Sequence, residues 1–219
     1  MKITIFAAGS RGDIQPCVAL GRALQHAGYQ VGLAAPQDFA EFVQAYGLDF
    51  HPLRGDVQQV MASATGRQFL GAEGANPLKS IRAIRTLLRP VVMAMAEDAY
   101  AACAQADAVI SLGVLSAFGH TCAEKLGRPL INLEPAPLLP TRAFAAPAWP
   151  WQRDLGRWPN YLSGLAMLQV VWLWYSPFVN AFRRRLGLRP WAAADFRRGL
   201  RSTPLLGAYS PSLIPPPAD

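Results

Sequence analysis

The sequence predicts an α/β fold in which a parallel sheet carries helices on both of its faces. Residues 2–8 form a short apolar run that ends at a glycine loop, a helical pattern follows, and a second apolar run covers residues 29–35. Gly28 separates the helical pattern from the second run, as expected where a helix ends. The alternation of strand and helix returns over residues 107–133. Since successive strand–helix–strand units build a parallel sheet, both halves of the chain are expected to share one Rossmann-like layered structure.

The other elements of the first half follow from the same patterns. The first helix is expected to begin near Pro16, because proline is tolerated in a first helical turn. A second helix is expected over residues 39–45, with Asp38 as its N-cap, and a third strand over residues 48–53.

A connection and a long helix are predicted next. Residues 54–77 are rich in glycine, which favours a connection with at most one short helix, around residues 57–63. A helical pattern then covers residues 78–105, and Pro90 is expected to kink or split that helix.

The first part of this long helix has a basic face, formed by Lys79, Arg82, Arg85 and Arg89. A basic stripe is typical of a solvated helix face. It is also typical of a helix that contacts anionic lipid, and the sequence leaves both interpretations open.

In the second half, strands are predicted over residues 107–112 and 129–133, with a helix over residues 116–126 between them. Residues 134–159 are rich in proline and tryptophan, which favours an ordered functional loop. Residues 161–179 contain no charged side chain and are predicted to be helical. Three roles stay open for that helix: a membrane span, an interfacial or pocket-lining helix, or a core helix.

Composition narrows the class of protein. Hydrophobic residues make up 52% of the 219 positions and charged residues 16%, which excludes a disordered chain. The net charge of +7 fits an anionic substrate or an anionic membrane surface, and no nucleic-acid-binding motif is present. Cys17, Cys103 and Cys122 lack metal-ligand spacing, so reduced, buried thiols and no metal site are expected. Without a secretory signal at the start, a cytoplasmic protein is expected, with peripheral membrane contact left open.

The loop Gly9-Ser10-Arg11-Gly12-Asp13 is the strongest candidate for chemistry. It joins the carboxyl end of the first strand to a helix, which is a favoured ligand position in open α/β sheets. The loop lacks the dinucleotide and P-loop fingerprints. Asp13 has two open roles, as a helix cap or as a base that removes a proton from a hydroxyl. His51 and His120 could face the same cleft, and a structural role is the alternative for each.

Several ordered motifs resemble the N-terminal domain of GT-B glycosyltransferases, in particular the family 28 group that includes sterol and antibiotic-aglycone glucosyltransferases. The first loop with Ile14-Gln15-Pro16 carries the resemblance, together with Gly28-Tyr29-Gln30-Val31 and Ala35-Pro36-Gln37-Asp38-Phe39. It continues at Ala123–Pro129 and at Pro137–Phe144. Further landmarks are Asn180-Ala181-Phe182-Arg183, Leu186-Gly187-Leu188 and Tyr209-Ser210-Pro211.

The resemblance implies roles for individual residues. Asp13 would be the general base, and Ser10, Arg11 and Gly12 would lie near the donor phosphates or the transferred sugar. The loop over 137–144 and the segment over 161–179 would border the acceptor site. The expected acceptor-binding residues are His51, His120, Pro140, Thr141, Phe144 and Trp172. No metal or cofactor is expected, and a nucleotide-sugar serves as co-substrate.

The resemblance also implies a domain organisation. Residues 1–208 would form the acceptor-binding domain and residues 209–219 the start of an interdomain linker, with the C-terminal donor-binding domain absent from these residues. The expected activity is inverting transfer of a hexose, from UDP-glucose, to a hydroxyl of a sterol-like, lipid or aromatic acceptor. Two alternatives stay open: a non-catalytic module that binds a hydrophobic ligand, and a subunit that works with a separate donor-binding partner.

Overall fold

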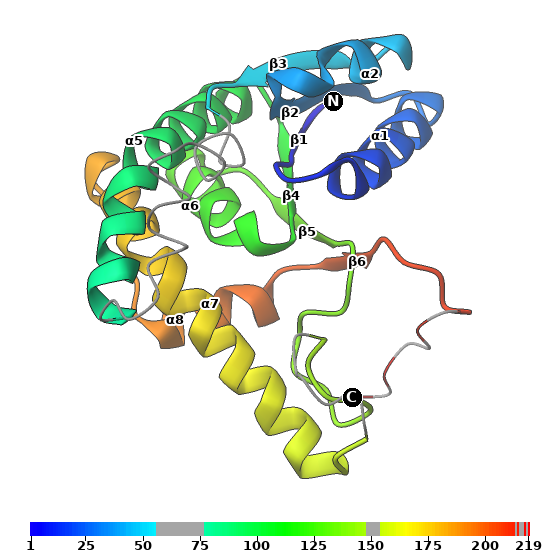
Figure 1. The fold of residues 1–219 in the computed structure, drawn as a ribbon. Coiled ribbons are helices and arrows are strands. Elements are labelled where there is room, and N and C mark those ends of the chain that lie inside the picture. Colours follow the sequence, from blue (N-terminus) through cyan, green and yellow to red (C-terminus); the bar gives the residue numbers. More distant parts are fainter. Residues whose placement is uncertain (56–76, 148–153, 213, 215–216, 218) are drawn as a thin grey trace.

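The computed structural model describes residues 1–55, 77–147, 154–212, 214, 217 and 219 (Figure 1). Within them, parallel strands form one sheet in the order β3-β2-β1-β4-β5-β6. The strands are β1 (Lys2–Phe6), β2 (Gln30–Pro36), β3 (Asp49–Leu53), β4 (Ala108–Leu112), β5 (Leu130–Glu134) and β6 (Leu205–Gly207). This order is that of a Rossmann fold, and it confirms the predicted fold class.

Helices cover both faces of the sheet. One face is covered by α1 and α2, and the other by α5, α6, α7 and α8 (Figure 1). The helices are α1 (Arg11–His26), η1 (Gln37–Phe39), α2 (Ala40–Ala45), α5 (Pro77–Ala104), η2 (Gly113–Leu115), α6 (Ser116–Leu126), α7 (Arg157–Arg185) and α8 (Ala193–Ser202).

The sheet separates two hydrophobic cores. Ile5 and Ile110 point to the α1 side, whereas Phe6 and Val109 point to the α5–α8 side. The alternation follows from the pleat, which sends successive side chains to opposite faces. All three cysteines are buried and free of disulfides, as the sequence predicts.

Three element boundaries differ from the prediction. Helix α1 begins at Arg11 with Ser10 at its N-cap, so Pro16 lies inside the helix instead of near its start. Asp38 does not cap a helix, because a 3₁₀ turn over Gln37–Phe39 precedes α2. Helix α5 is not split at Pro90 but runs from Pro77 to Ala104, since that proline is solvent-exposed and the carbonyl it leaves unpaired can be hydrated. The short helix expected around residues 57–63 lies outside the described residues.

Two elements near the end of the chain, α8 and β6, are absent from the sequence prediction. Strand β6 pairs with β5 just before the segment expected to be a linker. Helix α8 buries Phe196 and Leu200 against the core shared by α6 and α7.

The proline-rich loop that follows β5 packs against the first half of α7. At Gly164, a Cβ atom would lie only 2.7 Å from the Cα of Pro140, so the close approach of loop and helix requires glycine. The Ala146 amide donates to Ser163 Oγ at 2.9 Å, and Asn160 Nδ2 donates to the Arg142 carbonyl. These contacts hold the described part of the loop against α7.

Candidate active site

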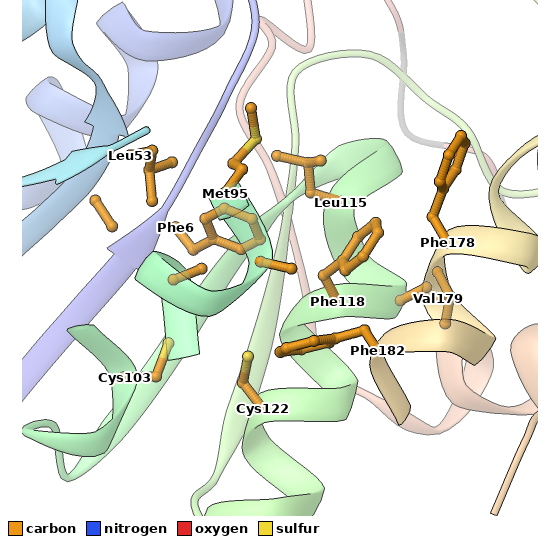
Figure 2. Packing of buried hydrophobic residues seen from close by; sticks show 14 of the residues in the cluster. Phe6, Leu53, Met95, Cys103, Leu115, Phe118, Cys122, Phe178, Val179 and Phe182 are labelled. Atoms are coloured by element: carbon orange, nitrogen blue, oxygen red, sulfur yellow. The ribbon is translucent and has the colours of Figure 1, made fainter. Parts of the chain in front are cut away.

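A cavity of about 510 Å³ opens at the carboxyl ends of the strands. This is where β1 and β4 lie next to each other and the chain order reverses, the usual ligand position in such sheets. The loop after β1 forms its polar end, and α5, α6 and α7 supply apolar walls. The lining side chains include Phe6, Asp13, Asp38, Phe39, Leu88, Met95, Leu115, Phe118, Trp174, Tyr175 and Phe178. Figure 2 shows Phe6, Met95, Leu115, Phe118 and Phe178 among the packed side chains of this region.

Asp13 lies at the third position of α1, half-buried at the polar end of the cavity. Its Oδ2 accepts hydrogen bonds from the Ser10 amide at 2.7 Å and from Ser10 Oγ at 2.9 Å. The hydrogen bond from the Ser10 amide to Asp13 is one half of a capping box. Asp13 therefore does cap α1, although it lies inside the helix. No hydrogen bond to Oδ1 occurs within the described part of the chain. One oxygen therefore fixes the carboxylate, and the other is available to a ligand.

Gly9 is required beside this carboxylate. Its φ of +142° lies in a region that favours glycine, and a Cβ atom there would lie 2.3 Å from Asp13 Oδ2. Gly9 therefore helps to position the Asp13 side chain in two ways: its backbone takes a conformation that favours glycine, and its missing side chain leaves room for the carboxylate.

The expected donor-binding residues are divided between two surfaces. Ser10 and Arg11 line the cavity with Asp13. The Arg11 guanidinium lies 5.0 Å from the centre of the Phe42 ring, in cation–π contact. Gly12 instead lines a separate groove between α1 and β6, together with Pro16, Leu133 and Gly207.

Helix α7 supplies an aromatic wall through Trp174, Tyr175 and Phe178. Burial raises the pKa of Tyr175, so its hydroxyl stays protonated at neutral pH. Trp172, which the sequence predicts at the acceptor site, faces away from the cavity. It is 5% exposed and stacks on Phe196, with 5.2 Å between ring centres.

Among the described helices, α7 alone has the length and apolar composition of a membrane span. Leu168, Trp172 and Phe182 on this helix pack into the core. Of the three roles that the sequence leaves open, the structure therefore places α7 both in the core and along the cavity wall.

The two predicted cleft histidines lie outside the cavity. His120 sits on α6, where its ring packs edge-on against Trp191 and its Nε2 lies 3.1 Å from Thr203 Oγ1. Burial lowers the pKa of His120 to about 4, so it is neutral at pH 7. His51 lies on β3 against Gly32, and its buried Nε2 has no partner among the described residues. Burial lowers the pKa of His51 as well.

The three predicted acceptor residues of the loop after β5 also lie apart from the cavity lining. Pro140 packs on Gly164 of α7, and Thr141 is buried with its hydroxyl donating to Asp219. Phe144 is half-buried in the same loop. Of the tryptophans on α7, Trp174 lines the cavity and the predicted Trp172 does not, and α5 adds Leu88, Val92, Met95 and Ala96, which the sequence analysis does not name. Their apolar spacing along the predicted helix was the available signal.

No cluster of three or more histidine, cysteine or acidic side chains suited to a metal ion occurs in the described residues. The polar side chains that line the cavity include the carboxylate of Asp13, held at one oxygen, the carboxylate of Asp38, the Ser10 hydroxyl and the Arg11 guanidinium. This set can hold a hydroxyl-bearing apolar molecule and accept a proton from it.

Curated relatives match the whole chain. A sterol 3-beta-glucosyltransferase of Arabidopsis thaliana is 29% identical over 223 residues, covering 100% of this chain and 36% of the relative. A sterol 3-beta-glucosyltransferase of Aspergillus fumigatus is 30% identical over 221 residues, covering 100% of this chain and 15% of the relative. The chain thus spans about a third or less of these relatives' length.

Solved structures share the fold. The glycosyltransferase of kitacinnamycin matches with a TM-score of 0.54 and 17% identity, covering 89% of this chain and 42% of that one. The calicheamicin glycosyltransferase CalG4 matches with a TM-score of 0.53 and 16% identity, covering 89% of this chain and 45% of that one. Residues 3–145 match the glycosyltransferase family 28 N-terminal domain, which is well over half of the chain. The chain belongs to this family and has the Rossmann-like fold of a GT-B N-terminal domain.

Proposed function

We propose that this chain is the acceptor-binding half of an inverting glycosyltransferase, with a sterol-like or other apolar alcohol in the cavity and Asp13 as general base. The observation that carries the proposal is an apolar cavity whose polar end holds a half-buried carboxylate fixed at a single oxygen. Its volume of about 510 Å³ is within the range of small-molecule sites. The sterol glucosyltransferase relatives support an acceptor of this kind.

In the proposed reaction, the acceptor hydroxyl enters the cavity with its oxygen directed at Asp13. The oxygen forms a bond to the anomeric carbon of a nucleotide-sugar, such as UDP-glucose, on the side opposite the diphosphate. The bond from that carbon to the diphosphate breaks, and its electron pair leaves with the diphosphate. The hydroxyl proton passes to Asp13, whose Oδ1 is free of hydrogen bonds within the described residues.

The chain organisation in this proposal has residues 1–208 as the acceptor domain and residues 209–219 as the start of a linker to a donor-binding domain. The greater length of the relatives supports this organisation. Ser10 and Arg11 would meet the donor from the cavity side. A cytoplasmic location fits the buried, reduced cysteines.

The test compares two carboxylates that line the same cavity, Asp13 and Asp38. Transfer from UDP-glucose to cholesterol is measured in a protein that joins this domain to a donor-binding domain, and binding of a fluorescent sterol is measured separately. Asp13→Asn keeps an oxygen that can accept the Ser10 hydrogen bonds, so the fold and sterol affinity should persist while transfer falls roughly 10²- to 10⁴-fold. Asp38→Asn is the matched control and should retain most of the activity.

Unchanged transfer by Asp13→Asn would remove this residue from the mechanism. Loss of transfer in Asp38→Asn alone would move the base to that residue. Tight sterol binding with no transfer by the wild-type protein from any nucleotide-sugar would favour a non-catalytic binding module.

A further inference from the structure

The apolar wall of the cavity carries a phenol hydroxyl that takes no part in the proposed reaction. Tyr175 of α7 is half-buried and lines the cavity between Trp174 and Phe178 in the sequence. The proposed reaction places the acceptor hydroxyl at Asp13, which lies near the start of α1. Two helices far apart in the sequence therefore each bring a polar group to the same cavity.

The rest of the helical wall offers hydrocarbon, a thioether and an indole. Figure 2 shows Met95, Leu115, Phe118 and Phe178, whose side chains contain no oxygen or nitrogen. Among the described side chains that α5, α6 and α7 contribute to the lining, Tyr175 has the only oxygen. Its hydroxyl is therefore an isolated polar group within a wall that otherwise suits a hydrocarbon skeleton.

The Tyr175 hydroxyl is available to a ligand. It forms no hydrogen bond within the described residues, whereas the hydroxyl of Tyr161 on the same helix accepts one from Arg201. The Tyr175 hydroxyl is also absent from the described polar atoms that are both unpartnered and sealed from solvent. Burial raises the pKa of Tyr175, so the phenol stays protonated at neutral pH and can both donate and accept a hydrogen bond.

The stretch of α7 that carries Tyr175 is fixed from the neighbouring helix. Arg85 of α5 donates to the Leu173 carbonyl, and its guanidinium lies 5.6 Å from the centre of the Trp174 ring. The two residues before Tyr175 are thus both held by the same arginine. A group on a fixed backbone loses little freedom when it binds, so the phenol is prepared for a specific contact.

A ligand with only hydrocarbon at this wall would be penalised. It would cover the Tyr175 hydroxyl and exclude water from it without supplying a hydrogen bond, and burial of an unpaired polar group is unfavourable. Phenylalanine would serve a hydrocarbon equally well, as it does three positions later at Phe178. An oxygen atom on the ligand would remove this penalty.

We propose that Tyr175 selects acceptors that carry a second oxygen, through a hydrogen bond between its hydroxyl and a hydroxyl or ketone of the ligand. The preferred acceptor is then an apolar alcohol with two oxygens, such as an oxygenated sterol, whose reacting hydroxyl lies at Asp13. This inference deepens the proposed function and rests on it, because it requires an apolar alcohol in the cavity. Sites that hydrogen-bond a ligand oxygen discriminate against analogues that lack it.

The test is equilibrium binding of three sterols to the 219-residue chain without a donor. Cholesterol is compared with 7-ketocholesterol and 25-hydroxycholesterol, which add one oxygen on the ring system and on the side chain. Each affinity is measured by displacement of the fluorescent sterol dehydroergosterol. At least one of the two oxygenated sterols should bind about tenfold more tightly than cholesterol, which corresponds to about 1.4 kcal/mol.

The variant Tyr175→Phe removes the hydroxyl and keeps the ring. It should weaken binding of the preferred oxygenated sterol about tenfold and leave cholesterol binding unchanged or up to about threefold tighter, because no unpaired hydroxyl remains. Tyr161→Phe is the matched control, since it removes the same atom from α7 at a residue outside the described cavity lining. This control should keep the wild-type preference.

Three results would overturn the inference. They are equal affinities of the three sterols for the wild-type chain, a preference that Tyr175→Phe retains, and an equal loss of preference in Tyr161→Phe. In each of these cases cholesterol still binds, so the proposed function stands. Failure of every sterol to bind would instead contradict the proposed function, and this inference with it.

Discussion

Two tryptophans on α7 lie two positions apart and should respond differently to truncation. Trp172 is 5% exposed and stacked on Phe196, so Trp172→Ala should cost about 3–5 kcal/mol of unfolding free energy. Trp174 is half-buried on the cavity wall, and its truncation should cost less than about half of that. With an unfolding entropy of about 2.1 cal/mol/K per residue, the Trp172 variant should melt about 7–11 °C below wild type.

The assay combines differential scanning calorimetry with titration of the fluorescent sterol dehydroergosterol. Below its melting range, Trp172→Ala should bind the sterol nearly as well as wild type, because its side chain does not line the cavity. Trp174→Ala should bind about tenfold more weakly, as expected for loss of an aromatic contact in a binding site. A melting temperature within about 2 °C of wild type for Trp172→Ala, or equal losses of sterol affinity in both folded variants, would refute this assignment.

Three further predictions concern pH and the first loop. Because the pKa of His120 falls to about 4 in the fold, the native state disfavours the proton, and stability is lost as the pH falls below 6.5. In urea unfolding, the loss of stability between pH 7 and pH 5 should therefore be about 2 kcal/mol greater for wild type than for His120→Gln. Burial raises the pKa of Glu134 to about 6. The contribution of this side chain to the stability of the fold is therefore fully present below about pH 4.5 and is lost as the pH rises through 6. Urea unfolding should therefore show Glu134→Gln up to about 2 kcal/mol more stable than wild type at pH 8 and no more stable at pH 4. Gly9→Ala should lower the free energy of unfolding, measured by thermal unfolding, by about 1–3 kcal/mol and should release the Asp13 side chain from its position. The loss should exceed that of Gly28→Ala, because a Cβ atom added at Gly28 meets no atom within 4 Å.

The sequence predicts elements well where a local signal decides them. Helix α6 covers the predicted residues 116–126 because Gly127, with φ of +63°, ends it in a left-handed cap. Helix α8 has a weaker signal, since only Phe196 and Leu200 are buried among charged neighbours. Strand β6 is three exposed residues long and depends on pairing with β5, which no local pattern can reveal.

The candidate site divides in the same way. The polar end could be predicted because a single loop carries Gly9, Ser10 and Asp13 at the end of β1. The apolar walls could not, because they depend on how α5 and α7 rotate against the sheet. Residues 161–179 carry no charged side chain to mark a solvent-facing side, so periodicity could not decide whether Trp172 or Trp174 faces the cavity. Tertiary packing makes that choice.

The basic stripe of α5 shows why two reasonable interpretations of one pattern can both be incomplete. Pro177 has no amide hydrogen, so the Leu173 carbonyl one turn earlier loses its helical donor. Arg85, from the predicted basic face, donates to that carbonyl. It therefore compensates for a proline far away in the sequence and joins α5 to α7, the two helices that wall the cavity. Neither a solvated face nor lipid contact describes this arginine, whereas its neighbours Arg82 and Arg89 remain exposed.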